Sequence, residues 1–210
     1  MQKLIVPAIL TEEKQELIRM CALCSSFCDY VQIDIMDGKF VQSKSVTVDN
    51  LKDLRLPVKS EAHLMVENPL EWLEVFKKIG SKRIIFHFEI NEDHEKIITE
   101  IKNAGMDVGI AVNPSTKINV FKHLLSIIDS VLFMSVIPGF YGSKFIPEVL
   151  TKISEFKRLY PGKCTGIDGG VKLDNITRVA ASGVDYICVG SAILKAEDPG
   201  AAYLVIEKNT

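Results

Sequence analysis

Eight short apolar runs alternate with longer amphipathic stretches from one end of the chain to the other, and this alternation restricts the fold more than any other feature. The runs are 4–10, 30–36, 59–66, 83–89, 107–113, 130–136, 163–168 and 186–193. Each has the length and composition of a buried strand. Strands that alternate with helices indicate a parallel sheet.

The stretches between these runs have helical patterns, at 11–28, 46–54, 69–78, 93–103, 116–128, 146–159, 173–181 and 199–208. Asn68-Pro69 and Asp198-Pro199 are typical helix starts, and Gly80, Gly105 and Gly183 are typical stops. Eight evenly spaced strand-helix units favour a closed (βα)8 TIM barrel of the α/β class over a doubly wound sheet. Since no linker or low-complexity tract interrupts them, we expect one domain over residues 1–210.

Composition excludes several classes of partner. The chain has 210 residues, of which 47% are hydrophobic, and its 25 basic and 27 acidic residues give a net charge of −2. This balance gives no electrostatic reason to expect nucleic acid or an anionic membrane as a partner. The apolar run 4–10 is too short to span a bilayer, and no charged leader precedes it. We therefore expect a cytoplasmic protein that acts on a small molecule, and association into a homo-oligomer stays open.

The cysteines do not predict a metal cluster. Cys21, Cys24 and Cys28 have spacings of three and four, which also describe one face of a helix, and no fourth clustered ligand follows. Free cysteine is commonly buried, so core packing is the preferred interpretation, for Cys164 and Cys188 as well. An odd total of five cysteines indicates reduced thiols in a reducing compartment.

Titratable side chains interrupt four of the apolar runs: Asp34, His63, His87 with Glu89, and Asp168. A buried charge is costly unless it is paired or bound to a metal, so these groups predict a function. Strand alternation places Gln32, Asp34 and Met36 on one face, as it does Glu61, His63 and Met65. In a barrel these faces line the lumen near the C-terminal strand ends, where barrel enzymes have their chemistry.

Asp34 and Asp168 are expected on strands two and seven, so their carboxylates would approach a ligand from different sides. This arrangement suits proton transfer by two bases next to a carbonyl group. Together with His63 they form a ligand set suited to zinc, manganese or iron, and such a divalent metal ion would stabilise an enediolate. The alternative for His63 is a core histidine bonded to Glu61 or to the backbone.

Three glycine-containing segments follow the late strands: 138–142, 168–170 and 190–192. Backbone N–H groups in such turns bind phosphate, although tight turns alone would also explain the glycines. Met36, Met65 and Met134 come late on their strands. They would line a sugar site or simply fill the core.

The segments VQIDIMDGKFV, EAHLMVENP, VGIAVNPST, MSVIPGFYGSKFIPEVL, GIDGGV and VGSAI, in this order, resemble the ribulose-phosphate 3-epimerase family. The resemblance implies a metal-dependent barrel that interconverts ribulose 5-phosphate and xylulose 5-phosphate at C3. It implies that Asp34 and Asp168 are the acid-base pair and, with His63, ligands of one divalent ion. The phosphate contacts that it implies are Gly139, Phe140, Tyr141, Gly142, Gly169, Gly170, Gly190 and Ser191.

The chain departs from the family pattern at four positions. Gln32 replaces a histidine that is the family's fourth metal ligand, which predicts weaker binding of zinc or a different metal. Ala8 replaces a substrate-contacting serine, Ile137 replaces a polar residue, and Tyr141 replaces a glycine. Each change removes polar character or space near the expected substrate.

Three alternatives remain. One is a 3-epimerase of a phosphorylated ketohexose, and another is a phosphosugar-binding barrel that has lost catalysis. A barrel kept only for structure or assembly leaves the two aspartates and His63 unexplained. Chemistry of the orotidine phosphate decarboxylase group is disfavoured because 34–37, Asp-Ile-Met-Asp, lacks that group's lysine.

Overall fold

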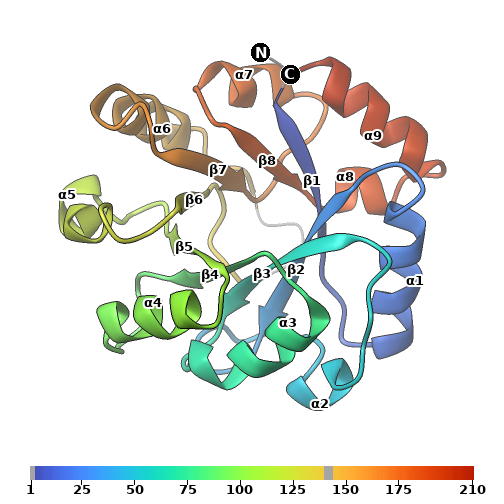
Figure 1. Ribbon diagram of the computed structural model, residues 1–210. Coiled ribbons are helices and arrows are strands. Elements are labelled where there is room, and N and C mark those ends of the chain that lie inside the picture. The colour runs from blue at the N-terminus through green and yellow to red at the C-terminus, as the bar shows by residue number, and fades with distance from the viewer. Residues whose placement is uncertain (1–2, 140–143) are drawn as a thin grey trace.

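Eight parallel strands close into a barrel in the computed structural model, which describes residues 3–139 and 144–210 (Figure 1). The strands are β1 (Leu4–Ile9), β2 (Tyr30–Met36), β3 (Lys59–Met65), β4 (Arg83–His87), β5 (Asp107–Val112), β6 (Ser130–Met134), β7 (Cys164–Asp168) and β8 (Tyr186–Val189). They neighbour one another in chain order, and β8 pairs with β1. The predicted (βα)8 TIM barrel is confirmed.

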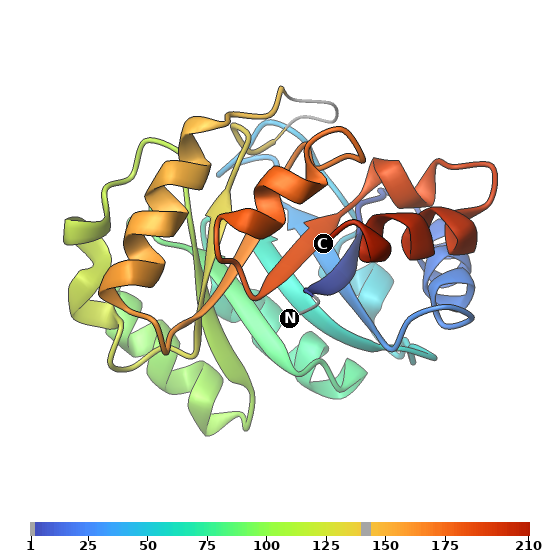
Figure 2. The ribbon, with the colours of Figure 1, turned by 90° about the horizontal axis from the view of Figure 1, so that it is seen from above.

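Helices surround the barrel on its outer side, as both ribbon views show (Figures 1 and 2). They are α1 (Lys14–Cys24), α2 (Val48–Leu51), α3 (Leu73–Ile79), α4 (His94–Asn103), α5 (Ile118–Phe121), α6 (Glu148–Leu159), α7 (Ile176–Ala181), α8 (Ser191–Leu194) and α9 (Pro199–Lys208), with 3₁₀ turns η1 (Pro69–Trp72) and η2 (Lys122–Leu124). The two ends of the chain meet beside β1, where the Lys3 backbone N–H donates to Thr210 Oγ1 at 3.4 Å.

The last strand is shorter than the sequence predicts. A strand over 186–193 was expected, but β8 ends at Val189 and Ser191–Leu194 forms α8. Gly190, with φ −89° and ψ −97°, leaves the strand conformation, and its carbonyl accepts from the backbone N–H groups of Ile193 and Leu194. A continuous apolar run does not distinguish a strand from a strand followed by a buried helical turn.

The barrel lumen has its own small core, separate from the larger core between strands and helices. Its buried members are Val6, Ala8, Ile85, Ala111, Leu132, Met134, Val136, Tyr186 and Cys188. Gly166 makes room for the Tyr186 ring, because a Cβ there would lie 2.2 Å from Tyr186 Cζ. The pairing register places Asp34 beside His63 and Met134 beside Asp168. The lumen therefore has a defined top layer at the C-terminal strand ends.

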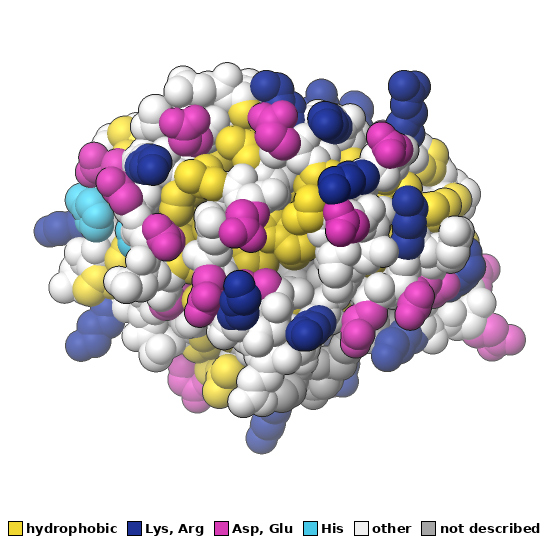
Figure 3. Space-filling model, turned by 90° about the horizontal axis from the view of Figure 1, so that it is seen from below, with side chains coloured by type: hydrophobic (Ala, Val, Ile, Leu, Met, Phe, Trp, Pro, Cys, Tyr) yellow, Lys and Arg dark blue, Asp and Glu magenta, His cyan; other side chains and the backbone are white. Residues whose placement is uncertain are grey.

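The surface and the cysteines agree with the composition. Acidic and basic side chains are interspersed over the face that carries α2 and α3 (Figure 3). Cys21 and Cys24 are buried in the core, and all five cysteines are free thiols. Among the described residues, no helix has the length and apolar character needed to cross a membrane.

Candidate active site

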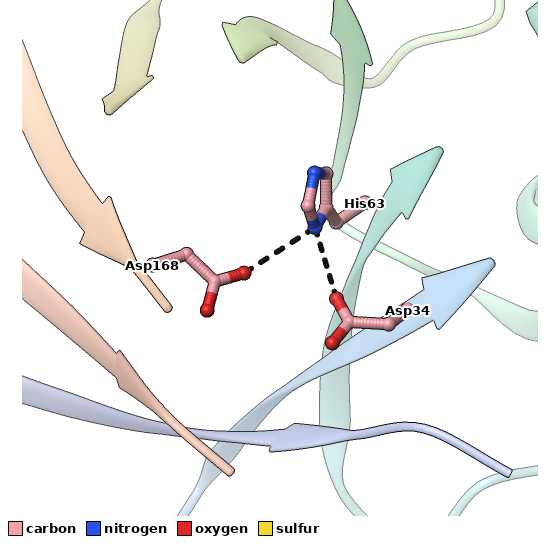
Figure 4. Close-up of side chains that lie close together, drawn as sticks. All are labelled: Asp34, His63 and Asp168. Carbon is pink, nitrogen blue, oxygen red and sulfur yellow. Dashed lines mark hydrogen bonds and ion pairs between the residues drawn. The ribbon is translucent and has the colours of Figure 1, made fainter. Parts of the chain in front are cut away.

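Three titratable side chains from β2, β3 and β7 meet at the C-terminal end of the lumen (Figure 4). His63 Nδ1 lies 3.0 Å from Asp34 Oδ1 and 3.4 Å from Asp168 Oδ2. The candidate ligand atoms of the three residues are all within 4.8 Å of one another. The sequence predicted that these residues would converge, and the described structure brings them together.

Gln32 lies beneath the two carboxylates and connects them. Its Nε2 donates to Asp34 Oδ1 at 2.8 Å and to Asp168 Oδ2 at 2.7 Å. Its Oε1 accepts from the Cys188 thiol at 3.1 Å. Gln32 thus offers hydrogen atoms, not a lone pair, to the site. For Gln32 to complete the metal shell in place of water, its amide would have to turn over and lose these bonds.

Burial and neighbouring charges shift the pKa values of Asp34 and His63. Burial, together with the charge of Asp168, raises the pKa of Asp34. For His63, burial disfavours the charged ring, but the bonds to Asp168 and Asp34 outweigh it and raise the pKa to about 10. Without a metal, a proton on His63 Nδ1 is therefore what separates the two carboxylates.

A second histidine continues the cluster away from the cavity. His87 Nε2 lies 3.0 Å from His63 Nε2, and His87 Nδ1 lies 3.3 Å from Glu89 Oε2. Burial lowers the pKa of His87 to about 4. The sequence marked His87 and Glu89 as unusual in an apolar run, but it assigned them no partner.

Glu61, one of the two partners that the core alternative for His63 offered, belongs to the opposite end of the barrel. A cavity of about 380 Å³ opens there, lined in part by Tyr30, Glu61, Arg83 and Tyr186. Glu61 Oε2 accepts from Tyr30 Oη at 3.3 Å and lies 3.4 Å from Arg83 Nη1. Its Oε1 has no partner among the described residues, and burial raises the pKa of Glu61 to about 7. His63 is bonded to Asp34 and His87 instead.

A cavity of about 200 Å³ opens above the three converging side chains. The residues that the sequence singled out along its walls are Asp34, Met36, His63, Met65, Met134, Gly139, Asp168, Gly169, Gly170, Gly190 and Ser191. Ala8 lies in the wall as well, whereas Ile137 is 67% exposed. The predicted contacts Phe140, Tyr141 and Gly142 lie outside the described residues.

The glycines at the cavity rim have backbone shapes that larger residues would not adopt. Gly169 has φ 112°, and a Cβ there would lie 2.5 Å from Val136 Cγ2. Gly170 has φ 64° and faces the backbone of Phe145. Gly190 precedes α8 in the adjacent loop. These loops bring backbone close to the cavity, as a phosphate site requires.

Among the titratable residues of the cavity wall, sequence reasoning missed Lys172, Cys188 and Lys195. Lys172 follows the Gly169-Gly170 pair by two residues, and Lys195 follows α8, so their places after glycine turns were the available signal. Cys188 was expected to be plain core. The donor set as a whole, one imidazole and two carboxylates, fits a divalent ion such as zinc, manganese or iron.

Two solved structures of enzymes named for phosphorylated compounds have the same architecture as this chain. The chain superposes on 3-hexulose-6-phosphate synthase from Salmonella typhimurium with a TM-score of 0.71, at 17% identity and over 100% of this chain and 98% of that one. For orotidine 5'-phosphate decarboxylase from Pyrococcus horikoshii the TM-score is 0.66, at 20% identity and 98% of both chains. At this identity the likeness shows the fold alone. Fold and site together define a (βα)8 barrel with an imidazole-carboxylate centre at the C-terminal strand ends.

Sequence relatives identify the particular family. Residues 4–194 match the family described as "Ribulose-phosphate 3 epimerase family". Ribulose-phosphate 3-epimerase from Mycobacterium leprae is 34% identical, over 99% of this chain and 95% of its own. The enzyme of that name from Aquifex aeolicus is 36% identical, over 93% and 91%. The cytoplasmic isoform from Oryza sativa is 32% identical, over 96% and 89%. This chain belongs to the ribulose-phosphate 3-epimerase family, whose members are isomerases.

Proposed function

We propose that this protein interconverts D-ribulose 5-phosphate and D-xylulose 5-phosphate by inverting the configuration at C3. The observation that carries the proposal is the placement of Asp34 and Asp168. They come from β2 and β7, on different sides of the lumen, and both contact His63 Nδ1 at the floor of one cavity. Family membership supports the substrate class, and the geometry supports the assignment of the two bases.

In this scheme one carboxylate removes the proton from C3, which leaves an enediolate, and the other carboxylate returns a proton to the opposite face. The two acids exchange roles in the reverse reaction, so the atoms balance in both directions. Burial, together with the charge of Asp168, raises the pKa of Asp34, which suits a carboxyl that carries a proton during part of the reaction. Gln32 Nε2 holds one oxygen of each carboxylate, which leaves the remaining oxygens for the substrate.

His63, Asp34 and Asp168 would hold one divalent metal ion. When bound, the ion would supply a positive charge that stabilises the enediolate oxygens more strongly than an imidazole alone would. The number of protein ligands would be three, because Gln32 presents its amide hydrogens.

The phosphate would lie among the glycine loops after β7 and β8. Gly169, Gly170, Gly190 and Ser191 line that part of the cavity, and Lys172 adds a positive charge at its rim. Met36, Met65 and Met134 would cover the apolar edge of the sugar chain. Barrel enzymes often bind phosphate at this position, after strands seven and eight.

Two alternatives make different predictions. A 3-epimerase of a ketohexose phosphate would have the higher kcat/KM for the hexulose phosphate. A phosphosugar-binding barrel would bind ribulose 5-phosphate without forming xylulose 5-phosphate. We also infer a cytoplasmic location, which the name of the Oryza sativa relative supports.

The test is the formation of xylulose 5-phosphate from ribulose 5-phosphate, measured with chelated protein and with protein refilled with zinc, manganese or iron. We expect turnover that depends on the added metal. Equal turnover in chelated protein would contradict the metal assignment. No turnover with any metal, while the phosphosugar still binds, would contradict the epimerase assignment.

A further inference from the structure

We propose that His87 and Glu89 are positioning residues that fix the ring orientation and the tautomer of His63. They keep the hydrogen of the neutral His63 ring on Nε2, so that Nδ1 can offer its lone pair to a metal ion held with Asp34 and Asp168. The importance of this lone pair rests on the proposed function, because it matters only if His63 is a metal ligand. The relay itself is a property of the protein's own hydrogen bonds.

The first link joins the two histidines. Nε2 of His63 and Nε2 of His87 are 3.0 Å apart, and both side chains are fully buried. The ring centroids are 5.2 Å apart and the planes differ by 28°, so the rings meet through their nitrogens and not face to face. One nitrogen must therefore donate and the other accept, because two hydrogens or two lone pairs would repel each other.

The second link is Glu89, which can only accept while it is ionised. Its Oε1 accepts from the backbone N–H of Asn113 at 2.8 Å and from Thr116 Oγ1. Its Oε2 lies 3.3 Å from His87 Nδ1. The two donors on Oε1 favour the ionised carboxylate, which has no hydrogen of its own. The hydrogen between Glu89 Oε2 and His87 therefore belongs to His87 Nδ1.

The loop that holds Glu89 is itself anchored to α6. Lys152 Nζ donates to the carbonyl oxygens of Asn113, Pro114 and Thr116 at 2.9, 3.0 and 3.1 Å. The Phe40 ring packs against His87, with centroids 4.8 Å apart. Glu89 and the His87 ring are thus held from several sides, which leaves His87 little freedom to rotate.

The direction of each hydrogen follows from this arrangement. A hydrogen on His87 Nδ1 leaves a lone pair on His87 Nε2, which accepts from His63 Nε2–H. When His63 gives up its Nδ1 proton to bind a metal ion, the remaining hydrogen is on Nε2 and the lone pair is on Nδ1, the nitrogen 3.0 Å from Asp34 Oδ1. Outer hydrogen bonds of this kind fix the tautomer of metal-binding histidines and typically contribute about 10–100-fold to metal affinity.

Zinc affinity of the whole protein, measured by competition with a chromophoric chelator, tests the relay. His87→Phe keeps a ring but removes the acceptor, so we expect zinc binding about 10–100-fold weaker than in the wild type. His87→Gln restores an acceptor and should recover part of the loss. The control is His123→Gln, at an exposed histidine outside the cluster, which should leave the affinity unchanged. Binding by His87→Phe within about twofold of the wild type would overturn the proposal.

Nitrogen-15 NMR of the labelled histidines gives a readout that needs no variant and no metal. We expect His87 as the Nδ1–H tautomer in both chelated and zinc-loaded protein. In Glu89→Gln, the bonds to Asn113 and Thr116 retain the amide oxygen, so the NH₂ group should face His87 and shift its hydrogen to Nε2. An Nε2–H or doubly protonated His87 in the wild type would overturn the relay. Failure of the wild type to bind any metal would instead contradict the metal in the proposed function.

Discussion

Nε2 of Gln32 lies 2.7 Å from Oδ2 of Asp168, so a side chain of β2 is hydrogen-bonded to a carboxylate of β7 through the barrel lumen. The same nitrogen lies 2.8 Å from Asp34 Oδ1. Two carboxylates that would otherwise repel each other share one amide. Gln32, which stands where the resemblance implies a histidine, therefore orients the proposed acid-base pair.

Gln32→His tests what that departure changes. An imidazole at this position would add a fourth ligand of the type that zinc prefers, so we expect zinc affinity to rise by about tenfold or more. Gln32→Leu is the matched variant that adds no ligand and removes both N–H donors. Zinc affinity measured by chelator competition should separate the two variants, and equal affinities would show that no ligand enters at this position.

Asp168→Asn tests the acid-base pair. The amide has nearly the shape of the carboxyl but cannot carry the proton, so turnover should fall by about 10²–10⁴-fold while the protein stays folded. The kcat of the epimerase reaction and the circular dichroism spectrum are the measurements. The control is Asp174→Asn, an exposed aspartate outside the cavity. Near-full activity of Asp168→Asn would remove this residue from the mechanism.

Glu61 predicts a pH-dependent stability at the other end of the barrel. Burial raises its pKa from 4.5 to about 7, so the folded state binds more protons than the unfolded state between these values. The resulting stabilisation is fully present below about pH 4.5 and is lost as the pH rises through 7. Urea unfolding should show that the stability of the wild type relative to Glu61→Gln declines over this window. A difference that is constant with pH would contradict the prediction.

Gly166→Ala tests the packing of the lumen. The added Cβ would lie 2.2 Å from Tyr186 Cζ, so the ring would have to move in a buried layer. We expect the free energy of unfolding to fall by about 1–3 kcal/mol. Gly162→Ala is a suitable control, because a Cβ there meets nothing within 4 Å. Both are measured by urea denaturation, and equal stability of the two variants would show that Tyr186 adapts freely.

The positions of the strands could be predicted because eight short apolar runs alternate with helical patterns along the chain. The inward-facing residues could be predicted because side chains on a strand alternate between its two faces. The convergence of Asp34, His63 and Asp168 could be predicted because each faces the lumen near the C-terminal end of its strand. The end of β8 was placed too late, because the apolar run continues past Gly190 through Ala192 and Ile193. The His63–His87 contact and the orientation of Gln32 depend on which nitrogens and oxygens meet between strands. A single sequence carries no record of those pairings.

The most direct test of the account is deuterium incorporation at C3 of ribulose 5-phosphate in heavy water, followed by NMR with metal-loaded protein. Proton transfer through Asp34 and Asp168 predicts that deuterium appears at C3 as xylulose 5-phosphate forms. It also predicts that the formation of xylulose 5-phosphate falls in both Asp34→Asn and Asp168→Asn. If the phosphosugar binds but C3 does not exchange with zinc, with manganese or with iron, the account is contradicted.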